Sequence, residues 1–242
     1  MKNRLRLDRL LANLGYGSRR EVQGLLSRGF VELDGEPLKK GDQIILVEEN
    51  LPSRLKVRGE ELDPLTGLHL VMNKPLAYTC SHKEKGEVVY DMLPERWKAR
   101  NPVLATVGRL DKETTGLLLL TDDGNLLHRI TSPKKAIAKR YHAKLARNLS
   151  GKEAALFGSG DLVLEGDEKS LLPAELEVLG PKEAILTIRE GRYHQVRRMF
   201  AAAGNHVEEL NRLSIGALAL PADLAPGEFR VVTAAELEKV FE

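Results

Sequence analysis

The chain reads GRLDKETTGL at residues 108–117 and continues with three further leucines at 118–120. This apolar run is bounded by Thr-Thr-Gly before it and by Asp-Asp-Gly at 122–124, which predicts a buried strand. One carboxylate, Asp111, stands a few residues before the strand. Taking a carboxylate out of water is costly unless a partner compensates the charge. Asp111 therefore either bonds backbone amides in a local turn or serves a chemical purpose, and the spacing alone favours the turn.

Composition limits the class of protein. A chain of 242 residues with 42% hydrophobic residues predicts one or two domains, each with a core. No apolar run approaches the ~20 residues that cross a bilayer, and the first residues lack the apolar stretch of a signal peptide. The single cysteine, Cys80, cannot form an intrachain disulfide, which is typical of a reducing compartment. We expect a cytoplasmic monomer without a membrane partner.

The positive charge is unevenly distributed along the chain. The net charge is only +2, yet residues 128–147 carry seven Lys or Arg and no Asp or Glu. Residues 1–40 add nine basic and five acidic side chains. Basic patches within a nearly neutral protein indicate a polyanionic partner with a defined footprint. A solvated surface laced with salt bridges is the alternative, and 128–147 offers it no acidic neighbours in sequence.

Residues 1–60 are predicted to form a separate small domain. Leucines at 7, 10, 11 and 14 have helical spacing, and Ser18 and Glu21 form a capping box that opens a second helix. An Asp-Gly turn at 34–35 then joins two apolar stretches. Arg19 and Arg20 lie in the first helical turn, where cations oppose the helix dipole unless phosphate is bound. The alternative is a two-helix packing module with surface arginines.

Residues 61–242 are predicted to form a second domain of the α+β class. Strand patterns at 68–72, 117–120, 141–145 and 184–188 are mixed with apolar helical stripes at 126–130 and 196–203. The order lacks regular βαβ spacing, which favours a mainly antiparallel sheet with flanking helices. No nucleotide-binding glycine motif and no cluster of Cys and His ligands is present in the sequence, so we expect neither a cofactor nor a metal.

Four ordered motifs resemble those of one family. The stretch at 108–117 resembles the catalytic motif of the pseudouridine synthases that modify structured RNA. Asn-Lys-Pro at 73–75 precedes it, and Lys-Arg-Tyr at 139–141 and EGRYHQVRRM at 190–199 follow it. The similarity is greatest to the RsuA type, the small-subunit ribosomal RNA pseudouridine synthases, and it implies the same α+β architecture. The N-terminal domain resembles an RNA-binding domain first known from a small-subunit ribosomal protein.

The resemblance also implies roles for individual residues. Asp111 becomes the catalytic carboxylate, Tyr141 an aromatic that stacks on the uracil, and Arg197 the cation that keeps the aspartate ionised. Ile188 is either a pocket wall or a core residue, and Lys74 shapes the site. Leu-Ala-Tyr follows at 76–78 where the family commonly has a glycine, which affects the expected conformation of this loop. The predicted RNA contacts are Arg19, Arg20, Arg109, Arg192, His194, Gln195 and Arg198.

The expected substrate is a uridine in bacterial small-subunit (16S) ribosomal RNA, either free or within a partly assembled small subunit. Segments at 79–81, 192–195 and 223–228 favour this branch over the large-subunit relatives. Two alternatives stay open: the same reaction on large-subunit (23S) RNA, and a non-catalytic ribosome-assembly factor that binds RNA through residues 1–60. The presence of Asp111, Tyr141 and Arg197 argues against the second.

Overall fold

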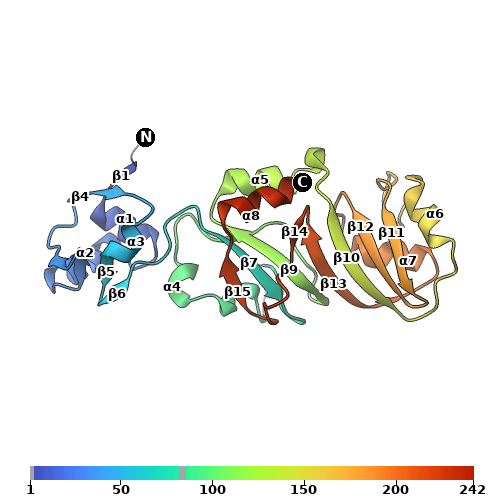
Figure 1. Ribbon diagram of the computed structural model, residues 1–242, viewed down its shortest axis with the longest axis horizontal. Coiled ribbons are helices and arrows are strands. Elements are labelled where there is room, and N and C mark those ends of the chain that lie inside the picture. The colour runs from blue at the N-terminus through green and yellow to red at the C-terminus, as the bar shows by residue number, and fades with distance from the viewer. Residues whose placement is uncertain (1–2, 82–85) are drawn as a thin grey trace. The chain divides into compact units, whose positions relative to one another are not determined.

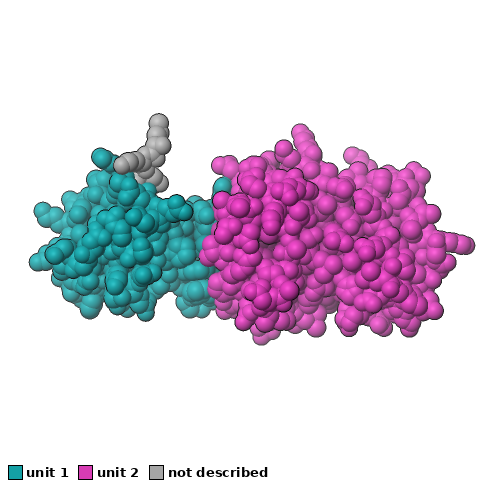
Figure 2. Space-filling view, in the orientation of Figure 1, with its two compact units in different colours: residues 1–68, 93–105, 121–123 teal, residues 69–92, 106–120, 124–242 magenta. Residues whose placement is uncertain are grey.

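The computed structural model describes residues 3–81 and 86–242, which fall into two compact units. Unit 1 comprises residues 1–68, 93–105 and 121–123, and unit 2 comprises residues 69–92, 106–120 and 124–242 (Figure 2). Unit 1 thus holds the predicted domain 1–60 together with residues 61–68, 93–105 and 121–123.

Two short helices and two small sheets build the N-terminal part of unit 1. Helix α1 (Leu7–Asn13) and helix α2 (Arg19–Ser27) pack their leucines into a core that also receives Leu51 and Leu55. Ser18 and Glu21 cap α2 reciprocally, which confirms the capping box. Strands β1 (Asn3–Arg6) and β4 (Ile44–Val47) form an antiparallel pair. The second sheet has the order β3 (Glu36–Pro37), β2 (Val31–Leu33), β5 (Leu55–Val57) and β6 (Glu60–Glu61).

A buried ion pair joins the two later segments of unit 1, and both of its members also bond backbone groups of the first segment. Helix α3 (Leu51–Arg54) belongs to the first segment and α4 (Glu95–Lys98) to the second. Arg100 and Asp122 lie 3.3 Å apart, with side chains 0% and 1% exposed. Asp122 also accepts the backbone N–H groups of Gly67 and Leu68. Both charges are thus compensated, as buried charges must be.

Unit 2 is built on one large sheet with the strand order β11-β12-β10-β13-β9-β7-β15. Its strands are β7 (His69–Lys74), β8 (Ala105–Thr106, paired with β9), β9 (Thr114–Thr121), β10 (Lys139–Leu145), β11 (Glu175–Gly180), β12 (Glu183–Ile188), β13 (Val207–Ile215), β14 (Leu218–Ala219, paired with β13) and β15 (Phe229–Val231). Most of the registered pairs are antiparallel, whereas β9 and β13 run parallel. The predicted α+β class with a mainly antiparallel sheet is confirmed.

Helices cover the sheet of unit 2 in two groups. Figure 1 shows α5 (Gly124–Thr131) and α8 (Ala234–Glu238) together near one end of the sheet, where residues of both join a core cluster with β7 and β9. At the other end lie α6 (Glu153–Gly158) and α7 (Gln195–Ala202), whose Phe157 and Phe200 rings meet edge to face at 5.3 Å. Short 3₁₀ helices occur at η1 (Val89–Met92), η2 (Pro133–Lys135) and η3 (Lys239–Phe241).

Strand β9 is buried on both faces, as its four leucines predict, because residues 117–120 are all 0% exposed. Gly116 near its start has φ +99°, and a Cβ there would lie 2.4 Å from the carbonyl oxygen of Arg212. A glycine is needed because β9 and β13 approach closely where Gly116 and Arg212 pair. This contact places the 108–113 turn beside β13.

Candidate functional site

A cavity of about 740 Å³ opens in unit 2 beside the 108–111 turn. Strands β10 and β13 and the segment at 188–196 form its other walls. The cavity brings together residues that are far apart in sequence, and it contains most of the predicted site. The predicted site residues that line the cavity are Arg109, Asp111, Tyr141, Ile188, Arg192, His194 and Gln195. Arg197 and Arg198 lie on α7, directly after this segment.

Asp111 presents its carboxylate to the cavity. The backbone of the turn is closed by the bond from Thr114 N to Asp111 O at 3.0 Å, and the carboxylate accepts no backbone amide from the part of the chain that the structure describes. Among the described side chains, His194 is the one paired with this carboxylate, with its Nε2 3.4 Å from Oδ1. Asp111 is 31% exposed at the side chain. The carboxylate is therefore available for chemistry and does not cap its own turn.

His194 is held in an unusual backbone conformation. Its φ is +48°, a left-handed region that few side chains adopt, and it directly precedes α7. The Tyr193 ring stacks on the imidazole at 4.0 Å between centroids. Strain of this kind is found at sites where the surrounding structure fixes a functional geometry. Here it turns the imidazole toward Asp111.

Tyr141 forms part of the cavity wall on β10. The residue is 8% exposed, and Ala143 and Leu145 on the same strand face are buried, as the alternation predicts. In the sheet, Tyr141 stands opposite Leu186 on β12 and Arg212 on β13. Its hydroxyl makes no hydrogen bond with the described residues. A flat, buried aromatic ring with an unengaged hydroxyl suits stacking against a nucleobase.

Arg197 has other partners than the one expected. Its guanidinium donates to Val207 O at 2.8 Å and to Glu113 O at 2.9 Å. The predicted ion pair with Asp111 is not formed among the described residues. The helical projection placed Arg197 correctly at the core boundary, and it is half-buried there. Its long side chain reaches two backbone carbonyls, one of them two residues after Asp111.

Lys74 binds the same turn through its ammonium group. The residue is fully buried on β7, and its Nζ donates to the carbonyls of Thr114 at 2.8 Å, Pro75 at 3.0 Å and Lys112 at 3.4 Å. Burial lowers the pKa of Lys74, against the attraction of nearby acidic groups. The prediction that Lys74 shapes the site agrees with these contacts. In the following loop, Ala77 adopts φ +73° where the family commonly has a glycine.

Arg192 and Arg198 form a network with protein groups. Both bind Asp167 at 2.8 Å, and Arg192 also contacts Glu190 at 3.2 Å. Gln195 is buried and bonds the backbone of Arg192 and the side chain of Glu190. These residues therefore fasten the 165–170 segment to the cavity rim. Their predicted contacts with RNA stay predictions.

Three basic residues that line the cavity had no role assigned from the sequence: Lys139, Arg189 and Arg212, of which Arg189 pairs with Glu175. Lys139 precedes Tyr141 by two residues, and Arg212 stands opposite Tyr141 on β13. Arg212 is 2% exposed. A sequence signal could have revealed Arg212, because this arginine lies between Leu210 and Ile215, two apolar residues of one strand. Such a residue is expensive to bury unless it has a partner or a ligand.

The three other arginines that were predicted to contact RNA are exposed. Arg109 is exposed at the cavity, whereas Arg19 and Arg20 are exposed on α2 of unit 1. The described residues contain no group of three or more potential metal ligands. None of the helices in the described ranges combines the length and apolar character needed to span a bilayer.

Comparisons with known proteins agree with this geometry. A family model for RNA pseudouridylate synthase matches residues 68–202, and one for the S4 domain matches residues 5–51. The ribosomal small subunit pseudouridine synthase A of Escherichia coli (strain K12) is 40% identical over 240 residues, which cover 98% of this chain and all of that protein. An uncharacterized RNA pseudouridine synthase of Bacillus subtilis (strain 168) is also 40% identical, over 98% of this chain and 99% of its own length.

A solved structure is also similar to this chain over nearly its whole length. A crystal structure of a pseudouridylate synthase matches with a TM-score of 0.68 at 36% sequence identity, over 98% of this chain and 99% of that one. Sequence and fold thus agree along nearly the whole length, and they confirm the resemblance drawn from the four motifs. The chain belongs to the RNA pseudouridine synthases of the RsuA type, enzymes that isomerise uridine in RNA, and it carries an S4 domain at its N-terminus.

Proposed function

We propose that the chain converts one uridine of bacterial small-subunit (16S) ribosomal RNA to pseudouridine, with Asp111 as the catalytic carboxylate. The observation that carries the proposal is the cavity in which the carboxylate of Asp111, free of backbone partners, faces the same space as the ring of Tyr141. The name of the Escherichia coli relative supports the choice of small-subunit RNA.

The reaction detaches uracil from ribose, turns the base and rejoins it through carbon 5. Product and substrate contain the same atoms, so the reaction has no need of an oxidant or reductant. An ionised Asp111 supplies the group that attacks or deprotonates the nucleoside. The extruded base stacks on Tyr141, which offsets part of the few kcal/mol lost on unstacking. His194 lies 3.4 Å from this carboxylate and helps to hold its position.

Arg197 and Lys74 support this chemistry by fixing the turn. Together they donate to the carbonyls of three consecutive residues, 112, 113 and 114, directly after Asp111. Catalysis by a positioned carboxylate depends on geometry at the level of an ångström, so the turn has to be rigid. We assign Arg197 to positioning through these carbonyls as well as to the electrostatics of the site.

RNA binding is assigned to both units. Arg19 and Arg20 on α2 and the basic segment at 128–147 supply phosphate contacts, which fix the position of the RNA without reading its sequence. Arg109, exposed at the cavity, is placed to hold the target nucleotide or its backbone. The proposed substrate is ribosomal RNA, free or within an assembling small subunit, and the enzyme acts as a cytoplasmic monomer.

The test is to map pseudouridines in ribosomal RNA with and without the protein. Deletion should remove one pseudouridine from 16S RNA, and the intact gene should restore it. Asp111→Asn should not restore it, because the amide is nearly isosteric but lacks the charge. Asp161→Asn is the matched control, since Asp161 is exposed and outside the cavity.

Three outcomes would contradict parts of the proposal. Loss of a 23S pseudouridine would move the substrate to the large subunit. No change in either RNA, together with a defect in subunit assembly, would favour a non-catalytic assembly factor. Turnover by a folded Asp111→Asn protein would remove Asp111 from the catalytic role.

A further inference from the structure

Two cations in the catalytic cavity lack an acidic partner. Arg212 donates through Nε to Leu117 O at 2.8 Å, while one of its terminal nitrogens, NH2, is buried without a hydrogen bond. Lys139 donates to the carbonyl of Ile137 at 3.2 Å. Neither makes a carboxylate ion pair within the residues that the structure describes. Arg212 is buried and Lys139 is half-buried. Cations taken out of water are normally paired, so these two favour a negative group of a bound ligand as their partner.

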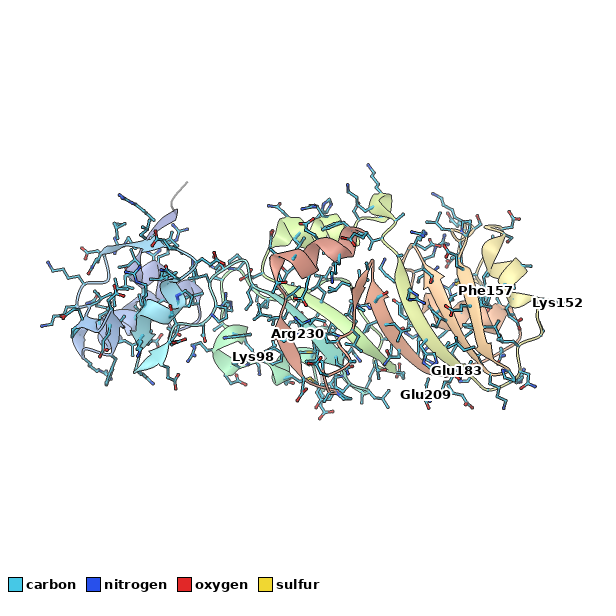
Figure 3. The ribbon with its side chains drawn as sticks, in the orientation of Figure 1. Lys98, Lys152, Phe157, Glu183, Glu209 and Arg230 are labelled. Carbon is cyan, nitrogen blue, oxygen red and sulfur yellow. The ribbon has the colours of Figure 1, made fainter. Side chains whose placement is uncertain are left out.

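Other basic residues of unit 2 show the contrast. Lys144, on the same strand as Lys139, pairs with Glu209 at 2.8 Å, and His142 pairs with Glu183 at 2.7 Å. Glu183 and Glu209, labelled in Figure 3, belong to β12 and β13, the two neighbours of β10. The strand thus has acidic partners for its basic groups outside the cavity and none at Lys139.

The electrostatics of the cavity agree with a site for an anion. Burial, followed by repulsion from Arg212, lowers the pKa of Lys139 to about 8, although Glu190 acts in the opposite direction. A bound negative oxygen would restore the charge of the lysine, because an opposite charge at short distance favours the ionised form. The cations also stand beside the catalytic groups: Lys139 is two residues from Tyr141, and Arg212 faces Tyr141 across the sheet.

We propose that Lys139 and Arg212 form a site for a negatively charged oxygen of the bound nucleotide. The inference rests on the proposed function. Two oxygens of a uridine nucleotide fit this chemistry: a carbonyl of the base and an oxygen of its phosphate. Proximity to Tyr141 favours the base. When the bond between uracil N1 and ribose C1′ breaks, its electron pair remains on the base and is shared with O2 and O4, so cations there stabilise the departing base.

The test compares the full-length protein with Lys139→Gln and with the control Lys144→Gln, which makes the same substitution on the same strand outside the cavity. For a base oxygen, Lys139→Gln should lower the single-turnover rate at saturating ribosomal RNA by about 100-fold, with unchanged RNA affinity. For a phosphate oxygen, the rate should persist, while affinity falls and the salt slope drops by about 0.7. An unchanged rate, affinity and slope would overturn the proposal.

A second measurement separates this inference from the proposed function. The pKa of Lys139 can be followed by NMR of its side-chain methylene in the presence and absence of saturating uridine 5′-monophosphate. The site predicts a clear rise in that pKa on binding, even if ribosomal RNA is not the substrate. An unaltered pKa with the nucleotide bound would refute the anion site, whatever the activity of the enzyme.

Discussion

Replacing Lys139 with Met should stabilise unit 2 near neutral pH. The folded protein lowers the pKa of Lys139 from 10.5 to about 8, so folding works against its charge. One pKa unit corresponds to about 1.4 kcal/mol, which gives up to about 3 kcal/mol of destabilisation from the lysine. Loss of the hydrogen bond to Ile137 O offsets about 1 kcal/mol of the gain in the variant. We therefore expect a net gain of about 2 kcal/mol.

The gain in stability from Lys139→Met should depend on pH, because the pKa of Lys139 differs between the folded and the unfolded protein. Below about pH 8 the lysine is charged in both the folded and the unfolded states, and the full penalty is present. Between about 8 and 10.5 the unfolded chain binds more protons than the folded chain, so wild-type stability rises with pH. The variant should therefore gain most below pH 8, and this gain should fall by about 3 kcal/mol by about pH 10.5, where the lost hydrogen bond leaves it about 1 kcal/mol less stable than wild type.

The assay has to report on unit 2 alone, because a two-unit protein need not unfold in one step. Hydrogen exchange of the amides in β10 and β13 meets that need. Lys144→Met is the control: its Glu209 partner raises the pKa of Lys144, so the opposite pH trend is expected. A variant at Lys139 that is less stable than wild type at pH 7, or a stability difference that does not change with pH, would refute the reasoning.

Three further predictions concern stability and RNA binding. Gly116→Ala should destabilise unit 2 by about 1–3 kcal/mol, because the added methyl would meet the backbone of β13 at 2.4 Å; a normal melting temperature would contradict this. Arg100→Met should cost about 3–5 kcal/mol by leaving Asp122 buried without its cation, measured as urea unfolding through the fluorescence of the single tryptophan, which lies in unit 1. The double variant Arg19→Gln, Arg20→Gln should weaken RNA binding and reduce its salt slope by about 0.7 per lost contact, with turnover at saturating RNA retained; an unchanged slope would argue for a packing role of α2.

The sequence by itself determined the elements whose signal is local. Four consecutive leucines identified β9, leucines at helical spacing identified α1, and a capping box marked the start of α2. These features depend on contacts within one turn or strand, so periodicity and capping chemistry are enough to find them. The motif around Asp111 also identified the family, since four ordered motifs remain recognisable without any structure.

Only the tertiary structure decided which long side chains meet which partners. Arg197 was placed on the correct helix face, but its guanidinium bonds the carbonyls of Val207 and Glu113 instead of Asp111. Arg198 and Arg192 similarly converge on Asp167. An arginine has several rotatable bonds and reaches many neighbours, so the face it occupies does not specify its contact.

Lys139 and Arg212 show the same limit of prediction from sequence. Lys139 stands in the Lys-Arg-Tyr motif at 139–141, yet nothing in that motif indicated that it forms no ion pair with a described carboxylate or that it lies near Arg212. Arg212 becomes part of the site because β13 runs parallel to β9 and antiparallel to β10, pairings between strands that are about 70 to 100 residues apart. Strand periodicity fixes which face a residue occupies, and only the folded sheet fixes what stands opposite it.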